Sequence, residues 1–459
     1  MPLSERRGPI TLGLLWLTMV TGFPSVLIGF EWYKAGLTLG QVLSCVLVSC
    51  LLLLVYAIPA AYLGARSGQT YGLLSRSMFG RWGSRLVSFN LVWVSIGWYG
   101  LTAIFLADGL QGLYHMPVPT VWLAAGLAVL MAFNNLFGFA GIANFARYLA
   151  APVLILWVGF TFCKATLSCP ATLIAAHNTQ TFSQALTLVS SFVIGYSVWG
   201  NEPDYWRYGK PHVLQSVLPL VVSLAIGQVI FPTAGWMMAW LSGVTDYAAA
   251  TNLMNQYAFG GMSIIAAVVL IVTYFAVNDS GLYGAINALE NITEVPRQKA
   301  VIALTVAGVL TAVGLSACAH AFELVATLSS IILPAATVIM IAECFLFSRL
   351  WGMRPDFSRV PAFHELPAIR WPALLALLTG FGVGVATSGL IPGSEFLHHG
   401  VCSLQAWLAA LVSYLVLRPI EQRCRAAEQR QILEKLLSVS AAAAPSASSL
   451  PGSSDQRHN

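Results

Sequence analysis

Charged residues are scarce in this chain. Only 9% of its 459 residues are Asp, Glu, Lys or Arg, whereas 57% are hydrophobic and the mean hydropathy is +0.75. A soluble domain carries about a quarter charged residues, because its surface has to be hydrated. The scarcity excludes an ordinary soluble domain. Apolar runs of about 20 residues, the length that crosses a bilayer core, recur along the whole chain.

The chain also lacks the residue patterns of a metal site and of an enzyme. None of its eight cysteines forms a CxxC pair or a zinc-type spacing with a histidine. The eight histidines lie in predicted loops or at the ends of predicted spans, so no nucleophile–base pair is expected at membrane depth. We therefore predict that the protein is not an enzyme and binds no metal or cofactor. Cys163 and Cys169 flank one outer connection, and the sequence leaves open whether they pair.

Twelve apolar segments qualify as membrane spans. They are predicted at residues 11–31, 41–63, 86–107, 118–139, 146–167, 183–202, 214–241, 261–288, 300–319, 323–346, 371–391 and 401–417. If the chain starts on the cytoplasmic side, 21 of its 23 Lys and Arg residues lie in cytoplasmic connections and tails, and only Lys34 and Lys164 lie outside. Because positively charged loops stay in the cytoplasm, both termini are predicted there. The net charge of +5 thus reflects topology and does not indicate nucleic-acid binding.

The predicted organisation is one membrane domain with short flanks. Residues 1–10 form a cytoplasmic N-terminal segment, residues 11–418 the transmembrane transporter domain, and residues 419–459 a cytoplasmic tail. From about residue 439 the tail is rich in Ala, Ser and Pro, a composition typical of disorder. The expected location is the cell (inner) membrane.

Two spans contain helix-breaking residues in their middle. Span 1 reads LTMVTGFPSVLIGF, with Pro24 next to two glycines, and span 6 reads FVIGYSVWGNEPDYWRYGK, with Pro203 and the polar Asn201-Glu202 pair. Either helix alone could carry an ordinary proline kink. The two are five spans apart, however, which is the correspondence expected if spans 1–5 and 6–10 form an inverted repeat. A matched pair of broken helices is the best sequence indicator of a binding site at the bilayer midplane.

Spans 3 and 8 contribute further candidate residues. Asn278 and Asp279 lie near the centre of span 8, where a carboxylate is costly unless it is paired or hydrated. The alternative is that these side chains only cap a neighbouring kinked helix. In span 3, Trp98 lies among small residues in GWYG, although a lone aromatic residue at that depth most often serves packing.

These segments resemble the nucleobase–cation symporter-1 family, which includes bacterial cytosine permeases, hydantoin and allantoin transporters, and fungal purine–cytosine permeases. Four stretches carry the resemblance, in the same order and spacing: YLGARSGQTYGLLSRSMFGRWGS, GWYG, NEPDYWRYGK and NDSGLYGAINALENIT. The likeness covers nearly everything except the tail. It implies an all-α integral membrane fold like that of the leucine transporter. That fold has a five-plus-five inverted repeat with broken helices 1 and 6, followed here by two C-terminal helices.

The resemblance also implies how a substrate is held. Family members stack a planar heterocycle between aromatic residues of spans 3 and 6, and Trp98 matches the first of these positions. The second position falls on Gly195, which is a departure from the family, so Tyr196 or Trp199 has to supply the other face. Ring stacking adds about 0.5–1.5 kcal/mol beyond burial, so the loss of one face weakens binding without abolishing it.

The polar positions of the family also differ here. They fall on Ser95 or Thr102 in span 3 and on Thr273 in span 8, so the hydrogen-bonding code departs from that of cytosine carriers. The substrate is therefore left open within the class of small planar heterocycles. The full predicted substrate-binding set is Phe23, Ser95, Trp98, Thr102, Gly195, Tyr196, Trp199, Thr273 and Asn278.

The expected ion site departs further from the family. Sodium-coupled relatives bind the cation with span 1 carbonyls, here those of Phe23 and Val26, and with two span 8 hydroxyl groups. The hydroxyl positions fall on Ala276 and Val277. Methyl groups cannot replace the oxygen ligands that a hard cation requires, so sodium coupling is predicted to be lost.

Proton coupling is the predicted substitute. A carboxyl group shielded from water can take up and release a proton near neutral pH, and Glu202 and Asp279 are the candidates. Because the family motif keeps acids at Asp204 and Asp279 as well, those two could be structural. Glu202, at the broken helix, is the preferred proton carrier.

Together these patterns predict a secondary active transporter that imports a nucleobase or a related heterocycle by proton-coupled alternating access. Two alternatives stay open: a sodium-coupled symporter of the same family, and a non-transporting membrane sensor with the same fold. The predicted partners are the heterocyclic substrate and the lipid bilayer, with the protein a monomer or a weak oligomer.

Overall fold

The structure is a computed structural model. It describes residues 5–175, 180–196, 200–245, 247–293, 295–318, 320–352, 357, 359–398 and 400–443. Over these residues the chain is helical, and the one pairing of extended backbone is an isolated bridge between Arg7 and Gly209. The chain divides into two compact units, Met1–Tyr414 and Leu415–Asn459.

The helices follow one another along the chain with short connections. The first two are α1 (Pro9–Val20) and α2 (Phe23–Lys34). The next are α3 (Leu39–Ser67), α4 (Tyr71–Tyr114), α5 (Thr120–Met131), η2 (Phe133–Phe137), α6 (Gly138–Phe145), η3 (Ala146–Ala150), α7 (Ala151–Ser168) and η4 (Ala171–Ala175). Then come α8 (Phe182–Gly195), α9 (Pro203–Trp206), α10 (Val213–Leu224), η5 (Ala225–Ile230), α11 (Phe231–Ser242) and α12 (Tyr247–Phe259). The last are α13 (Ser263–Ile292), α14 (Arg297–Leu315), α15 (Ala321–Ile341), η6 (Ala342–Phe347), α16 (Ser348–Trp351), η7 (Phe363–Glu365), α17 (Trp371–Thr387), η8 (Glu395–Leu397) and α18 (Cys402–Ala443).

Many of these helices can cross a bilayer. Within the described residues, eight helical stretches are long and apolar enough, and the number is nine if the bent pair α1 and α2 counts as one span. The eight are Leu39–Ser67, Tyr71–Tyr114, Thr120–Ser168, Val213–Ser242, Ser263–Ile292, Arg297–Leu315, Ala321–Trp351 and Cys402–Ala427. Two more, α8 and α17, are apolar but shorter. The chain is therefore a multi-pass membrane protein.

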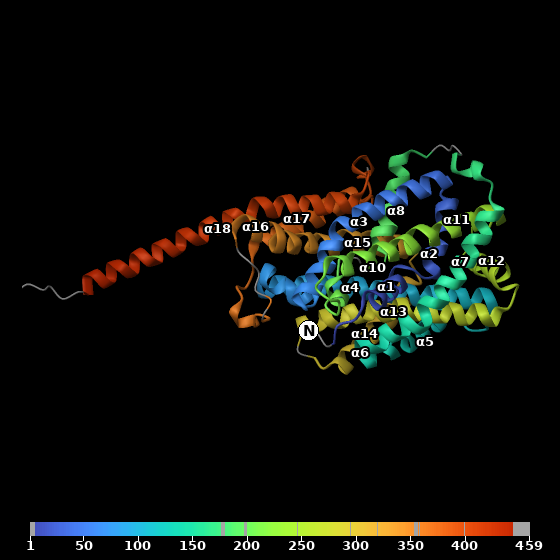
Figure 1. Ribbon diagram of the computed structural model, residues 1–459, viewed down its shortest axis with the longest axis horizontal. Coiled ribbons are helices and arrows are strands. Elements are labelled where there is room, and N and C mark those ends of the chain that lie inside the picture. The colour runs from blue at the N-terminus through green and yellow to red at the C-terminus, as the bar shows by residue number, and fades with distance from the viewer. Residues whose placement is uncertain are drawn as a thin grey trace, which may run out of the picture. The chain divides into compact units, whose positions relative to one another are not determined.

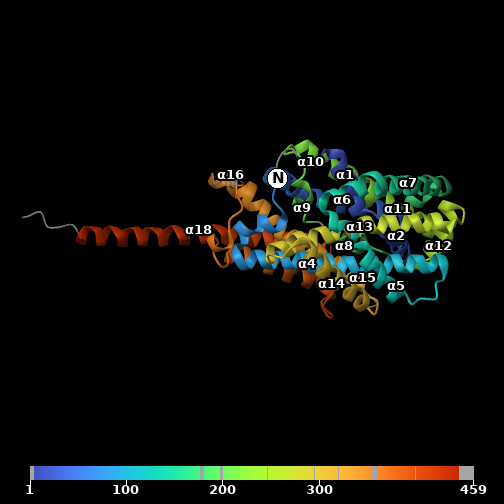
Figure 2. The ribbon, with the colours of Figure 1, turned by 90° about the horizontal axis from the view of Figure 1, so that it is seen from below.

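The stretch from Thr120 to Ser168 covers the spans predicted at 118–139 and 146–167. Its helices α5 and α7 are joined by the short helical segments η2, α6 and η3 and not by an extended loop. At Gly138 the backbone adopts φ 66°, which glycine reaches without steric cost, so the direction can change between η2 and α6. Figure 2 shows α5 and α7 as two separate rods.

The first helix is interrupted where the sequence predicts it. α1 ends at Val20 and α2 begins at Phe23, and the two are bent by 43°. Pro24 lies in the first turn of α2, where its missing N–H costs no hydrogen bond. We call Thr21 and Gly22 the α1–α2 break. The sixth predicted span is interrupted as well, because α8 ends at Gly195 and α9 begins at Pro203. We call the residues between them the α8–α9 break, of which Tyr196 and residues 200–202 are described.

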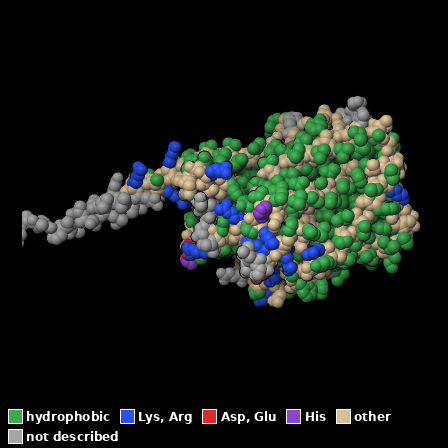
Figure 3. Space-filling view, viewed as in Figure 1, with side chains coloured by type: hydrophobic (Ala, Val, Ile, Leu, Met, Phe, Trp, Pro, Cys, Tyr) green, Lys and Arg blue, Asp and Glu red, His purple; other side chains and the backbone are tan. Residues whose placement is uncertain are grey.

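The long helices α4 and α13 pack along each other, and α1 packs on α13 (Figures 1 and 2). Figure 3 shows hydrophobic side chains over most of the visible face of the Met1–Tyr414 unit, with Lys and Arg gathered toward the end that holds α16. An apolar surface with a basic end is what a membrane-embedded bundle with one positively charged face requires.

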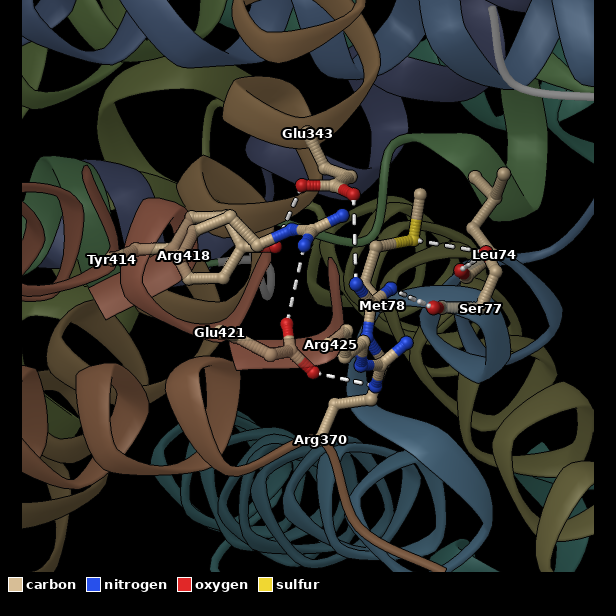
Figure 4. Close-up of polar contacts among 9 residues, drawn as sticks. All are labelled: Leu74, Ser77, Met78, Glu343, Arg370, Tyr414, Arg418, Glu421 and Arg425. Carbon is tan, nitrogen blue, oxygen red and sulfur yellow. Dashed lines mark hydrogen bonds and ion pairs between the residues drawn. The ribbon is translucent and has the colours of Figure 1, made fainter. Parts of the chain in front are cut away.

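Figure 4 shows two polar clusters, one in each unit. In the first unit the half-buried Glu343 carboxylate accepts a hydrogen bond from the Tyr414 hydroxyl at 2.8 Å and lies 3.8 Å from the Arg370 guanidinium. In the second unit Glu421 pairs with Arg418 at 3.2 Å and with Arg425 at 2.6 Å, one helical turn apart. The helix α18 that carries this second cluster continues to Ala443, so it includes the first residues of the stretch whose composition predicts disorder.

Candidate functional site

A small cavity lies where four elements meet. Its lining comes from α1, α4, the residue that follows α8, and α13: Met19, Trp98, Tyr99, Thr102, Tyr196, Val277, Asn278 and Gly281. The volume in which the centre of a water-sized sphere fits is about 20 Å³. A water molecule needs roughly 10–15 Å³ on this measure, so this conformation has room for water but not for a heterocycle. A heterocycle can therefore enter this cavity only if its walls move apart.

Two aromatic rings form the walls of this cavity. The Trp98 indole meets the Tyr196 ring edge to face, with centroids 5.2 Å apart and an interplanar angle of 88°. Tyr196 is in turn stacked on Phe192 of α8, at 5.0 Å and 22°. In this conformation the two walls touch each other, and a ring placed between them would have to separate them.

The orientation of Trp98 is fixed by a hydroxyl group on α15. The Trp98 indole N–H donates to Ser329 Oγ at 3.2 Å, and Ser329 Oγ donates to the Gly195 carbonyl at 2.8 Å. One hydroxyl therefore links the span 3 aromatic residue to the end of α8. Ser329 was not among the residues predicted from the sequence.

Gly195 does not line the cavity. A Cβ atom at this position would lie 2.0 Å from the Ala326 carbonyl oxygen of α15, so α8 and α15 pack too closely for any side chain. This contact explains the departure from the family at Gly195, and it leaves Tyr196 as the described aromatic residue on this side of the cavity. Trp199, the other candidate, lies outside the described residues.

Two predicted polar residues do line the cavity. Asn278 donates from its side-chain amide to the Tyr99 carbonyl at 3.2 Å and to the Met131 sulfur at 2.8 Å. Thr102 donates to the Trp98 carbonyl at 2.7 Å. Thr102 is thus oriented by a bond within α4, and Asn278 of α13 by bonds to α4 and α5.

Three predicted residues lie elsewhere. Thr273 is buried and donates to the Leu270 carbonyl of its own helix at 3.1 Å. The buried Ser95 hydroxyl has no hydrogen-bond partner among the residues that the structure describes. Phe23 stacks on Trp157 at 5.4 Å and 16° and lines a second, smaller cavity. None of the three lines the cavity at Trp98.

The predicted sodium ligands lie in closely packed surroundings. An ideal Cβ on Gly235 of α11 would lie 1.7 Å from the Val26 carbonyl oxygen, so this oxygen packs against α11. Val277 fills the space beside the α1–α2 break, since its Cγ2 would lie 3.1 Å from a Cβ at Gly22. Ala276 is buried and contributes only a methyl group.

The α1–α2 break is stabilised by α10–η5–α11 instead. The buried Gln228 amide in η5 donates to the Val20 carbonyl, the last of α1, at 2.9 Å. A carbonyl at a broken helix end must find a donor when water is absent. A lone amide within an apolar span is the signal that could have identified Gln228 from the sequence.

Glu202 lies in the α8–α9 break and is fully buried. One carboxylate oxygen accepts a hydrogen bond from the Gly200 N–H at 3.1 Å, and the other has no partner among the described residues. The Tyr56 hydroxyl, which is also buried and without a described partner, is close enough to Glu202 for electrostatic interaction. Glu202 does not line the cavity at Trp98.

The two neighbouring acids have structural partners. Asp204 accepts from the Tyr71 N–H at 3.0 Å and so caps the start of α4. Asp279 accepts from the Asn134 amide at 2.6 Å, and its main-chain carbonyl accepts from the Asn135 amide at 3.0 Å. Asp279 therefore anchors η2 to α13, as the structural alternative for this residue anticipates.

The last sequence predictions to compare with the structure concern metal binding and the pair Cys163 and Cys169. No group of three or more His, Cys, Asp or Glu residues that could hold a metal ion occurs in the described part of the chain. Cys163 and Cys169 are free thiols in the structure.

Comparisons with known proteins place this fold in a family. A family model described as "Permease for cytosine/purines, uracil, thiamine, allantoin" matches residues 3–417. The cytosine permease of Escherichia coli strain K12 is 25% identical over 431 residues, which cover 92% of this chain and 94% of that protein. A purine-uracil permease of Arabidopsis thaliana is 26% identical over 250 residues, covering 47% and 40%.

Solved structures share the architecture. Mhp1, a nucleobase-cation-symport-1 family transporter, in a closed conformation with bromovinylhydantoin bound, matches with a TM-score of 0.73 at 18% identity, covering 92% of this chain and 94% of that chain. A Na⁺-coupled sialic acid symporter matches with a TM-score of 0.65 at 10% identity, covering 91% and 90%. At these identities the likeness establishes the fold.

Proposed function

The chain belongs to the permease family for cytosine, purines, uracil, thiamine and allantoin, and on this premise we propose that it imports a nucleobase-like planar heterocycle by proton-coupled alternating access. The relatives it matches are transporters and not enzymes. The observation that carries the proposal is the cavity between the α1–α2 break, α4, the end of α8 and α13, with Trp98 and Tyr196 as its walls.

The packing of the helices supports a five-plus-five inverted repeat within twelve spans. We count α1–α2 as span 1 and α8–α9 as span 6. In an inverted repeat, each contact between two spans should then recur between the two spans five positions away along the chain. The packing of α1 on α10 and of α2 on α11 (spans 1 and 7) corresponds to that of α8 on α3 (spans 6 and 2). In the same way the packing of α4 on α14 (spans 3 and 9) corresponds to that of α13 on α5 (spans 8 and 4). The packing of α15 on α8 (spans 10 and 6) corresponds to that of α7 on α1 (spans 5 and 1).

The proposed topology places both termini in the cytoplasm of a cell whose inner membrane holds the protein. It rests on the asymmetry of 21 against 2 basic residues between the two sides. Residues 1–10 are then a short cytoplasmic segment, residues 11–418 the transporter domain and the remainder a cytoplasmic tail. The protein works as a monomer or a weak oligomer.

The substrate is proposed to enter by separating Trp98 from Tyr196. A planar ring in the gap would stack on either aromatic face, which is worth about 0.5–1.5 kcal/mol per pair beyond burial. Asn278 and Thr102 border the same space and supply polar contacts. Ligand binding shifts the equilibrium between states only by its differential affinity for them, so opening of the walls and binding are linked.

Coupling to a proton through Glu202 is supported by what surrounds each candidate. Asp279 and Asp204 each accept a hydrogen bond from another element, whereas the donors to Glu202 among the described residues are the local main-chain N–H groups of Gly200 and of Glu202 itself. Glu202 Oε2 and Asp279 Oδ1 both lack a partner among the described residues, so the preference for Glu202 rests on its place in a helix break without a donor from another element. Movement of the α8–α9 break would expose this carboxylate to one side and then to the other.

The experiment is uptake into proteoliposomes of purified protein. Radiolabelled cytosine, uracil, hydantoin and allantoin are each offered with an inside-alkaline pH gradient, with sodium or choline as the external cation. We expect uptake of at least one compound that a protonophore abolishes and that choline replacement leaves unchanged.

Three other results distinguish the alternatives. Uptake that requires sodium makes the protein a sodium-coupled symporter. Ligand-induced stabilisation without uptake makes it a sensor; a ligand at 100 times its Kd stabilises by about 2.7 kcal/mol, which a thermal-shift assay detects. If no planar heterocycle is taken up and none stabilises the protein, the proposed substrate class is wrong.

A further inference from the structure

The long helix α4 is interrupted near its start, and a loop pairs with the interruption. Gly80 has φ 77°, which frees main-chain groups on either side of it. The N–H groups of Arg81 and Trp82 donate to the Pro367 and Ala368 carbonyls, both at 2.9 Å, and the Arg370 N–H donates to the Phe79 carbonyl at 3.1 Å. These three bonds hold the start of α17 level with residues 79–82 of α4.

From this level α4 and α17 pack together and present apolar side chains outward. On α4, Trp82 (54% exposed), Leu86 and Phe89 follow one another at helical spacing. On α17, Trp371, Leu375 and Leu378 (51% exposed) do the same. Two partly exposed tryptophans at one level, with aliphatic residues beyond them, are typical of helices that meet the boundary between headgroups and acyl chains.

Two arginines at the same level have no acidic partner. Arg81 and Arg85 are half-buried, and the buried Nε atom of each lacks a hydrogen-bond partner within the described ranges. Neither forms an ion pair with a carboxylate in that part of the chain. The Arg85 guanidinium lies 4.8 Å from the Trp82 ring and 4.8 Å from the Phe363 ring.

Glu365, the acid that the structure describes on the paired loop, is already engaged elsewhere. Glu365 accepts from Arg359 at 2.8 Å and from the Ala362 N–H at 3.0 Å. These two donors lower the pKa of the Glu365 carboxyl from its usual value, so it stays an anion bound to Arg359. The charge of Arg81 and Arg85 therefore remains available to an anion from outside the protein.

We propose that Arg81, Arg85 and the exposed stripes of α4 and α17 form a binding site for an anionic phospholipid. The lipid phosphate lies against the two guanidinium groups, and an acyl chain follows the groove from Trp82 and Trp371 toward Phe89 and Leu378. Guanidinium groups form paired hydrogen bonds with phosphate, and basic pockets between membrane helices select anionic headgroups. A lipid is favoured over a soluble phosphate because the apolar stripes continue directly from the arginines.

The test compares lipid binding to detergent-purified full-length variants by native mass spectrometry. The probes are dioleoyl phosphatidylglycerol and dioleoyl phosphatidylcholine. We expect the unmodified protein to bind phosphatidylglycerol preferentially, and Arg81→Gln/Arg85→Gln to bind it about thirtyfold more weakly, given about 1 kcal/mol per arginine and tenfold per 1.4 kcal/mol. The matched control is Arg423→Gln/Arg430→Gln, which removes two exposed arginines of α18 and should leave binding unchanged.

Several results would overturn the site. These are equal binding of the two lipids, an unchanged affinity of the Arg81/Arg85 variant, or displacement of the lipid by an equal concentration of inorganic phosphate. If that variant does not fold, the unmodified protein answers the question alone. A photoactivatable phosphatidylglycerol should label residues 82–89 and 371–378, and labelling confined to other helices rejects the proposal.

Discussion

The two helix breaks occupy corresponding places in the fold but differ in chemistry. At the α1–α2 break the Val20 carbonyl at the end of α1 accepts a hydrogen bond from the neutral Gln228 amide, and Val277 packs beside Gly22. At the α8–α9 break a carboxylate, Glu202, receives one N–H from Gly200, while the Thr337 hydroxyl donates to the Gly200 carbonyl at 2.8 Å. One break is closed by neutral groups, and the other retains an ionisable side chain.

Under the proposed inverted repeat and proton coupling, this difference would place the ion chemistry in the second half of the repeat. Broken helix ends supply main-chain carbonyls and N–H groups in both halves, so the side chains around each break decide what it can bind. Around α1–α2 the side chains are neutral: the Gln228 amide, the hydroxyls of Thr21 and Ser25, and the methyl groups of Val277. Around α8–α9 the carboxyl group can exchange a proton.

The largest effect is expected from Glu202→Gln, which tests whether the α8–α9 break carries the proton. The amide keeps the size and the hydrogen bond from Gly200 but cannot carry a proton, so uptake driven by a pH gradient should fall at least tenfold. Substrate affinity, measured by thermal shift, should change less than threefold, because Glu202 does not line the cavity. Glu323→Gln, at an exposed acid on α15, is the matched control and should transport normally. Gradient-driven uptake by Glu202→Gln at the normal rate would remove Glu202 as proton carrier.

The next prediction concerns the close packing that positions the α8–α9 break. Gly195→Ala should lower the free energy of unfolding by about 1–3 kcal/mol, since the added Cβ would meet the Ala326 carbonyl. Gly159→Ala on α7, where nothing lies within 4 Å, should instead be neutral or stabilising by up to about 1 kcal/mol. Thermal unfolding of both variants in the same detergent measures the contrast. Equal stability of the two would mean that α8 and α15 are not in close contact.

Local composition was sufficient to locate both interruptions. Pro24 and its neighbouring glycine predicted a break where α1 ends at Val20, and Gly195 and Pro203 bracket the second break. The breaks are local features, because proline and glycine act on their own backbone. Trp98 was assigned to the binding site through the family resemblance, and it lines the cavity.

Contacts between distant elements could not be read in the same way. That Gly195 faces Ala326, that the Val26 carbonyl packs on Gly235, and that Ser329 orients Trp98 all depend on how closely two helices approach. Hydrophobic periodicity carries no information on that distance. The short helical segments between α5 and α7 were not predicted, because Gly138 permits a change of direction without a polar loop.

A smaller effect is expected from the link between α15 and the cavity wall. Trp98→Phe and Ser329→Ala each remove the indole–hydroxyl bond and should weaken substrate binding about fivefold, corresponding to about 1 kcal/mol for one buried hydrogen bond. Because both changes remove the same bond, the double variant should be little worse than either single one. Ser330→Ala, whose hydroxyl bonds only within its own helix to Thr327, is the control. Fully additive effects in a thermal-shift titration would show that the two side chains do not act together.

The smallest effect should come from an attempt to restore sodium coupling at the α1–α2 break. Ala276→Ser/Val277→Thr returns two hydroxyl groups to α13, yet sodium should change the affinity for substrate less than twofold. The reason is that the Val26 carbonyl, one expected main-chain ligand, already packs against Gly235 of α11. Titrations in sodium and in choline, on this variant and on the unmodified protein, give the comparison. A large gain of sodium dependence would show that the two breaks differ only in the side chains of α13, and that the backbone of the first half is still arranged for a cation.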